Sequence, residues 1–259
     1  MMCKPHYIFI IFILVLCQWS CDKDPGQKDL ILVPDEFILN LGQEVTSQGP
    51  APSFQFRTIN LVDCKMKDLL IFYSPVGNRL IVYLDGIIEN EECVGEDRLL
   101  NKDVFSYLPF GTFQVEIKIK NIIENSGQLR INDSSFHLEM DSSHGFRLDR
   151  AEVNRIPSNH IWGNIECIGP CADNLIEQFE EVLENYITLS EVLTDGDYDL
   201  FFIAGHKIQL KDHPKNIRNK QFIYQMQGDM NELRDRINQF KLTHPELKMS
   251  ITTSQGRFI

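Results

Sequence analysis

The sequence predicts an α+β protein built from two successive regions, an antiparallel β-sandwich and a smaller β-α-β-β-α-β unit. Between residues 31 and 156, apolar and polar residues alternate in short runs separated by turn-forming residues, which is the two-residue period of strands with one buried face. After Pro157, apolar residues recur at spacings of three and four between further strand-like runs, which is typical of amphipathic helices. We therefore expect two domains, at residues 31–156 and 157–259.

The first region is expected to contain short strands joined by tight turns. Residues 113–119 are the clearest example, because every second side chain is apolar and the intervening ones are polar or charged. Turn-forming pairs such as Asp85-Gly86 and His144-Gly145 lie between the runs. Further strands are expected at residues 53–59, 69–73, 79–84, 129–131, 136–140 and 146–148. Short strands with turns this frequent predict an antiparallel sandwich.

One segment of this region carries a resemblance that bears on its fold. The sequence YLPFGTFQVEIKI, residues 107–119, is similar to the Leu-Pro-x-Gly-x-aromatic strand entry of many immunoglobulin-like and transthyretin-like modules of exported proteins. The resemblance implies that the sandwich belongs to one of these two types. It implies no activity.

The second region is expected to combine strands with two helices. The expected elements are, in order, a strand at 161–167, a helix at 172–187, strands at 198–204 and 222–226, a helix from 229, and a strand at 247–251. Asp229, with Glu232 three residues later, is placed as the N-terminal cap of the second helix. The order β-α-β-β-α-β is that of a ferredoxin-like split unit, which we expect over residues 157–259.

The N-terminus has the layout of an export signal. Ten apolar residues, 7–16, follow the basic Lys4 and lead to Cys21. A membrane-spanning helix needs about 20 apolar residues, so this run is too short for a permanent span. We expect residues 1–20 to be a signal peptide and the charged residues 21–30 to be a flexible tether.

The residues around Cys21 resemble the lipobox of bacterial lipoproteins, in the loose form of the Bacteroidota type. Small Ser20 precedes the cysteine and acidic residues follow it, although Gln18 stands where the strict pattern has an aliphatic residue. The resemblance implies that Cys21 becomes the first mature residue and carries acyl chains, such as palmitate, that attach it to a membrane. It also implies a place in the cell envelope, at the periplasmic or surface face of the outer membrane. The alternative is ordinary cleavage, which leaves the Cys21 thiol free.

The charge of the chain excludes one class of partner. Removing residues 1–20 takes away one lysine and no acid, which leaves 24 basic and 37 acidic residues and a net charge of −13. Binding to nucleic acid depends on the neutralisation of phosphates by lysine and arginine, so a surface this acidic repels such a ligand. We therefore expect no nucleic-acid partner.

Four cysteines follow the predicted lipidation site. An even number in an oxidising compartment favours two disulfides, and local pairing joins Cys64 to Cys93 and Cys167 to Cys171. The second pair lies between an expected strand and an expected helix, where the helix dipole favours a thiolate. Redox chemistry and metal ligation are therefore alternatives to a structural bridge at Cys167 and Cys171.

Two polar clusters are weaker candidates for a metal site. Asp195, Asp197 and Asp199 alternate like the start of a calcium loop, but the glycine and the glutamate that such a loop needs further along are absent. His206 and His213 lack the one-turn spacing of a zinc-binding helix. We interpret both clusters as solvated surface groups and expect no metal or other cofactor.

No catalytic motif stands out, so the sequence favours a non-catalytic binding or assembly module at the envelope that recognises a protein or a glycan. Trp162 is a candidate for stacking on a ligand, and the alternative for this residue is a place in the interface between the two domains. A thiol-redox enzyme that uses Cys167 and Cys171 is the alternative function. A third hypothesis is a structural lipoprotein that supports a larger complex.

Overall fold

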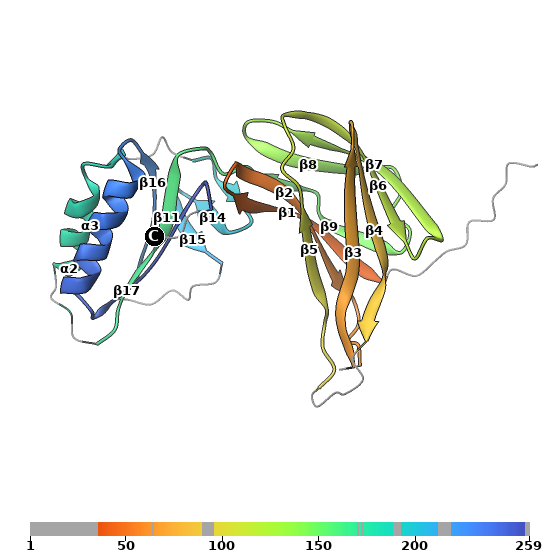
Figure 1. Cartoon of the computed structure of the whole chain (residues 1–259), viewed down its shortest axis with the longest axis horizontal. Coiled ribbons are helices and arrows are strands. Elements are labelled where there is room, and N and C mark those ends of the chain that lie inside the picture. Colours follow the sequence, from red (N-terminus) through yellow and green to blue (C-terminus); the bar gives the residue numbers. More distant parts are fainter. Residues whose placement is uncertain are drawn as a thin grey trace, which may run out of the picture. The chain divides into compact units, whose positions relative to one another are not determined.

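The computed structural model describes residues 36–63, 65–89, 96–169, 171, 174–188, 193–211 and 219–256 (Figure 1). Of these residues, 57% lie in strands and 12% in helices. They belong to one compact unit, Pro34–Ile259. No helix in the described ranges is long and apolar enough to cross a membrane. The predicted signal peptide and tether lie outside the described residues.

The first half of the described chain forms two β-sheets. The smaller sheet has the strand order β5 (Asn101–Phe105), β2 (Gly49–Thr58), β1 (Phe37–Thr46) and β9 (Phe146–Arg150). The larger sheet has the order β10 (Glu152–Asn154), β8 (Ser135–Met140), β7 (Ile123–Ile131), β6 (Gly111–Ile119), β4 (Arg79–Glu89) and β3 (Met66–Val76). Both sheets contribute to one hydrophobic cluster, the first core, which includes Leu39, Phe56, Val82, Leu129 and Phe136.

The side chains of β6 alternate along the strand as the sequence indicates. Phe113, Val115, Ile117 and Ile119 are buried, whereas the residues between them are exposed or half-buried. Full burial of an apolar side chain of this size contributes roughly 1.5–3 kcal/mol relative to exposure, so these four positions hold the strand on the first core. The strand predicted at residues 113–119 is therefore confirmed.

The two sheets are mixed, which corrects the prediction of an antiparallel sandwich. β1 pairs with β9 in parallel and β4 pairs with β6 in parallel, whereas the other neighbours are antiparallel. β4 and β6 run the same way because the chain leaves the larger sheet after β4, adds β5 to the smaller sheet and then returns. Parallel neighbours need a crossover of this kind. A period of two residues reports which face is buried, but not the direction of the neighbouring strand.

The second half of the chain contains a four-stranded sheet covered by two helices. Its strand order is β12 (Ile187–Thr188), β16 (Asn219–Met226), β11 (His160–Cys167) and β17 (Leu247–Thr253). The helices α2 (Leu175–Leu183) and α3 (Met230–Thr243) lie on one face and share a second core with the sheet (Figure 1). The Asp229 carboxylate accepts hydrogen bonds from the backbone N–H groups of Asn231 (2.7 Å) and Glu232 (3.0 Å), which confirms Asp229 as the N-cap of α3.

The prediction of an α+β fold with a ferredoxin-like C-terminal domain is wrong. The described residues are mostly strand and contain only two helices. A separate three-stranded sheet, β13 (Gly196–Asp197), β14 (Phe201–Ala204) and β15 (Lys207–Leu210), stands where the sequence predicted one strand and a polar loop. Its strands have two to four residues, and runs this short give too few alternations to be told from a loop.

A third hydrophobic cluster joins the three-stranded sheet to the rest of the fold. Trp162 of β11 is only 3% exposed and packs against Phe201, with ring centroids 5.6 Å apart. Tyr198 stacks on the same Phe201 ring at 5.0 Å. Val45 of β1 also packs against this third core. Residues on both sides of the predicted domain boundary at 156 thus share buried contacts.

Candidate functional site

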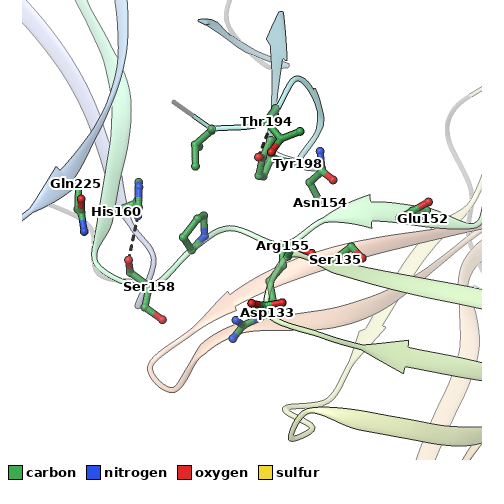
Figure 2. A pocket seen from close by; sticks show the side chains of 13 residues that line it. Asp133, Ser135, Glu152, Asn154, Arg155, Ser158, His160, Thr194, Tyr198 and Gln225 are labelled. Carbon is green, nitrogen blue, oxygen red and sulfur yellow. Dashed lines mark hydrogen bonds between the residues drawn. The ribbon is translucent and has the colours of Figure 1, made fainter. Parts of the chain in front are cut away.

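A pocket of about 480 Å³ lies where the two halves of the described chain meet (Figure 2). Its walls come from the turn before β8, from β10 and the segment after it, from the start of β11, from the residues around β13, and from β16. The lining residues are Asp133, Ser134, Ser135, Glu152, Asn154, Arg155, Pro157, Ser158, His160, Leu193, Thr194, Tyr198 and Gln225. Most of them are polar, so the pocket offers hydrogen bonds rather than an apolar surface.

The turn before β8 is held in place by Asn132. Its side-chain Oδ1 accepts hydrogen bonds from the backbone N–H groups of Ser134 (2.9 Å) and Ser135 (2.7 Å). The carbonyl of Ser134 in turn accepts a 2.8 Å hydrogen bond from the backbone N–H of Arg155. This Asx-type turn therefore presents Asp133 beside Arg155, as Figure 2 shows.

His160, Thr194 and Tyr198 form another part of the wall. His160 is buried, and its Nδ1 lies 3.0 Å from the carbonyl oxygen of Ser158 (Figure 2). In the neutral ring this contact assigns the proton to Nδ1, because a carbonyl oxygen can only accept. The Tyr198 hydroxyl donates a 3.1 Å hydrogen bond to the carbonyl of Thr194. Both rings are thus oriented by backbone acceptors.

Arg155 is the cation of the pocket. Its Cζ lies 4.9 Å from the ring centroid of Phe110, which is a cation–π distance. Its Nε is buried and has no hydrogen-bond acceptor among the described residues. Partial burial lowers the pKa of Arg155, and the nearby Tyr107 and Asp133 oppose that change. The guanidinium stays charged, and it shares the lining with two carboxylates, those of Asp133 and Glu152.

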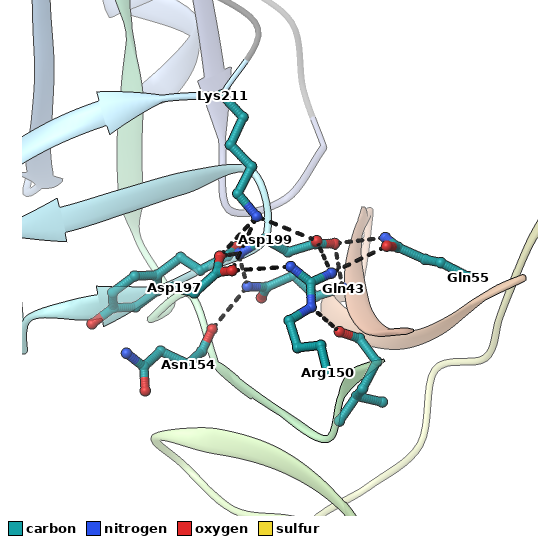
Figure 3. Close-up of polar contacts among 9 residues, drawn as sticks. Gln43, Gln55, Arg150, Asn154, Asp197, Asp199 and Lys211 are labelled. Carbon is teal, nitrogen blue, oxygen red and sulfur yellow. Dashed lines mark hydrogen bonds and ion pairs between the residues drawn. The ribbon is translucent and has the colours of Figure 1, made fainter. Parts of the chain in front are cut away.

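A second set of polar side chains, the junction network, lies beside the pocket (Figure 3). It consists of Gln43, Gln55, Arg150, Asp197, Asp199 and Lys211. The buried Gln43 amide donates from Nε2 to the carbonyl oxygens of Asn154 (2.8 Å) and Tyr198 (2.6 Å). Its Oε1 accepts a 3.1 Å hydrogen bond from the backbone N–H of Ile156. Each polar atom of this buried amide therefore has a partner, as burial requires.

Arg150 is the centre of the junction network (Figure 3). Its Nη1 donates to the Asp197 carboxylate at 3.1 Å, and its Nη2 donates to Gln55 Oε1 at 3.1 Å and to the Asp199 carboxylate. Asp199 also accepts hydrogen bonds from the backbone N–H of Gln43 and from the side chain of Gln55, each at 2.9 Å. The buried Asp199 carboxylate thus has a cationic partner and two neutral donors, which together offset its loss of water.

The carboxylates around Arg150 differ in their pKa. Burial raises the pKa of Glu44, and the charges of Asp103 and Asp199 raise it further. Burial followed by the charge of Asp199 also raises the pKa of Asp103. For Asp197, burial acts upward, but hydrogen bonds from Lys211 and from the backbone N–H of Asp199 outweigh it and lower the pKa. Glu44 and Asp103 are therefore the two carboxylates here whose ionised form is disfavoured.

Of the cysteines that the sequence marks as candidates, the structure describes Cys167 and Cys171. The sulfur atoms of Cys167 and Cys171 lie 2.26 Å apart, at disulfide distance, and the Cα atoms lie 6.1 Å apart. Both side chains are half-buried and pack against the second core. Cys21, Cys64 and Cys93 lie outside the described residues. Neither Cys167 nor Cys171 lines the pocket.

The other candidates from the sequence do not line the pocket. Trp162 is buried in the third core, so its ring is not available for stacking on a ligand, and the same cluster includes Val45 of β1. Asp195 accepts a hydrogen bond from the backbone N–H of Gly205 (3.0 Å), whereas the other two aspartates of that run belong to the junction network. His206 lies in an exposed turn, and His213 is outside the described residues. No group of three His, Cys, Asp or Glu side chains in the described ranges could hold a metal ion.

No pattern in the sequence points to the residues that line the pocket. Asp133, Arg155 and His160 come from separate elements, and no spacing along the chain marks them as neighbours. Comparison with models of known families, with curated proteins and with solved structures finds no match for this chain. Function must therefore be inferred from the pocket and its surroundings.

Proposed function

We propose that this chain is a lipid-anchored, non-catalytic binding protein of the bacterial cell envelope that holds a small polar ligand in the pocket around Arg155. The observation that carries the proposal is the buried Arg155 Nε, which has no acceptor among the described residues although Arg155 lines a polar pocket. A buried donor without a partner costs roughly 1–3 kcal/mol, so the fold keeps Arg155 at this position at a cost, and Arg155 lines the pocket, where a ligand can meet it.

The shape and chemistry of the pocket support the same proposal. Its volume of about 480 Å³ is within the range of small-molecule sites. The lining combines donors, such as the Arg155 guanidinium, with acceptors, such as the carboxylates of Asp133 and Glu152. The Asn132 turn and the His160 contact hold parts of the pocket wall before a ligand arrives, which reduces the entropic cost of binding. The anchoring part of the proposal rests on the lipobox-like residues around Cys21.

Thermal unfolding of the full-length protein in detergent, with and without a library of small polar compounds, tests the pocket. A compound that binds the native state raises the Tm by mass action. The Arg155→Met variant keeps the bulk of the side chain but removes its donors, so the affinity for such a compound should fall at least tenfold. Arg130→Met is the matched control, because Arg130 is an exposed arginine outside the lining.

The two variants separate a ligand site from a general effect. Loss of binding in Arg155→Met together with retention in Arg130→Met supports the pocket. If Arg155→Met binds as tightly as the unmodified protein, or if no compound raises the Tm, the pocket is not a ligand site and the proposal fails.

A second candidate is an envelope thiol-redox protein that uses Cys167 and Cys171. The observation that favours it is the half-buried position of both side chains, at the end of β11 and just before α2, where a reductant can reach them. A redox role requires that mild reductant opens the pair while the fold stays intact. Titration with a dithiol, followed by alkylation and mass spectrometry, measures this, and resistance of the pair to reduction before unfolding would exclude the redox role.

A further inference from the structure

Two exposed aromatic side chains stand beside the pocket, in the segment that links β5 to β6. Phe110 is 62% exposed and Tyr107 is 47% exposed, and we call them the aromatic platform. Leu108, between them in sequence, packs against the first core and anchors the segment. Gly111 follows with φ 147°, a value that residues with a side chain rarely adopt, so the turn from Phe110 into β6 requires glycine.

Arg155 connects the aromatic platform to the pocket. Its guanidinium lies over the Phe110 ring at 4.9 Å, yet the ring keeps most of its surface exposed to solvent. The same guanidinium lies close enough to Tyr107 and Asp133 for both to influence its pKa. The Phe110 ring therefore contacts a cation that also lines the pocket, while most of the side chain remains exposed.

We infer that the ligand of this pocket is a neutral oligosaccharide, with one sugar ring stacked on the exposed part of the aromatic platform and the hydroxyl groups of neighbouring rings bonded to the pocket lining. The inference rests on the proposed function and names the ligand class for that site. A sugar ring has apolar faces of C–H groups and a rim of hydroxyls, each of which donates and accepts. Aromatic faces pack against the C–H faces of the sugar. The carboxylates and the guanidinium of the lining form hydrogen bonds with its hydroxyls.

The charges of the lining favour a neutral sugar over a charged ligand. Asp133 and Glu152 are acidic and Arg155 is the one permanent cation of the lining, so an anionic ligand meets a slight excess of negative charge. The whole chain has a net charge of −12, which acts in the same direction. A simple cation brings no acceptor for the Arg155 guanidinium, whereas a sugar hydroxyl does.

Calorimetric titration of the full-length protein in detergent tests the inference. The probes are hexasaccharides of glucose, mannose and xylose, with a hexasaccharide of galacturonic acid as the acidic counterpart. We expect at least one neutral probe to bind, and its Kd to rise about tenfold or more in Phe110→Ala and in Tyr107→Ala. Phe72→Ala is the matched control and should leave the Kd unchanged, because Phe72 is 53% exposed on β3, at the far edge of the larger sheet from β10. Circular dichroism verifies that each variant is folded.

The possible failures are distinguishable. If the neutral probes do not bind while other polar compounds bind in an Arg155-dependent way, the sugar inference is overturned and the proposed function stands. Tighter binding of the galacturonate probe than of every neutral probe would also overturn it. Equal affinities of the unmodified protein, Phe110→Ala and Tyr107→Ala would exclude the aromatic platform. If nothing binds in an Arg155-dependent way, the proposed function fails as well.

Discussion

The backbone N–H of Gln43 donates a 2.9 Å hydrogen bond to Oδ2 of Asp199, although the two residues lie 156 positions apart in the chain. The Gln43 side chain adds hydrogen bonds to the end of β10 and the segment after it, and to the segment after β13. Both segments also contribute walls to the pocket. The junction network therefore sets the distance between pocket walls that come from remote parts of the sequence.

Gln43→Leu should lower the free energy of unfolding by about 2–3 kcal/mol, because the carbonyls of Asn154 and Tyr198 and the N–H of Ile156 would be left buried without partners. Equilibrium unfolding in urea measures the change. Gln48→Leu, in the exposed turn between β1 and β2, is the control and should change stability by less than about 0.5 kcal/mol. Similar losses in the two variants would contradict the assigned role of the buried amide.

Arg150 and Asp199 should behave as a coupled pair. Arg150→Met leaves the buried Asp199 carboxylate without its closest cation and should destabilise the fold by about 2–4 kcal/mol. In a double-mutant cycle, Asp199→Asn should cost at least about 1 kcal/mol less when Arg150 is already methionine. Urea unfolding of the four proteins gives the coupling energy. Strictly additive losses would show that the two side chains act independently.

Glu44→Gln and Asp103→Asn should each stabilise the protein at pH 7. Burial and neighbouring carboxylates raise the pKa of both groups in the folded state. Such an acid lowers the stability of the native state as the pH rises from its unfolded pKa, about 4, through its folded pKa. The gain should be no more than on the order of 0.5 kcal/mol, because both side chains are exposed and screened by solvent. It should disappear at pH 3.5, so a gain of equal size at both pH values would rule out the charge as its cause.

Cys21→Ala should release the protein from the membrane fraction of cells that process bacterial lipoproteins. The unmodified protein is expected to begin at Cys21 and to carry acyl chains, because two or more chains are needed for stable anchoring. Intact mass spectrometry of both fractions measures the added mass. Detection of a soluble, unacylated protein that retains Cys21 would contradict the lipobox resemblance.

Local patterns in the sequence predicted several elements correctly. The alternation at residues 113–119 identifies β6 because one face of that strand is buried along its whole length. Asp229 could be recognised as a helix cap because its carboxylate bonds to N–H groups only two and three residues away. In contrast, the sequence did not predict β13, β14 and β15 as a separate sheet, because strands of two to four residues are too short to show an alternating pattern. The strand directions were also missed, because pairing joins segments far apart in the chain.

The sequence by itself determined which side chains face a core along the longer strands, the cap of α3 and the pairing of Cys167 with the nearby Cys171, since each depends on neighbours within a few residues. Only the tertiary structure decided the burial of Trp162 in the third core and the convergence of Asp133, Arg155 and Tyr198 around one pocket. The physical reason is the length scale: periodicity and capping act over a few residues of chain. A binding pocket depends on which distant elements pack together, and no local pattern encodes that choice.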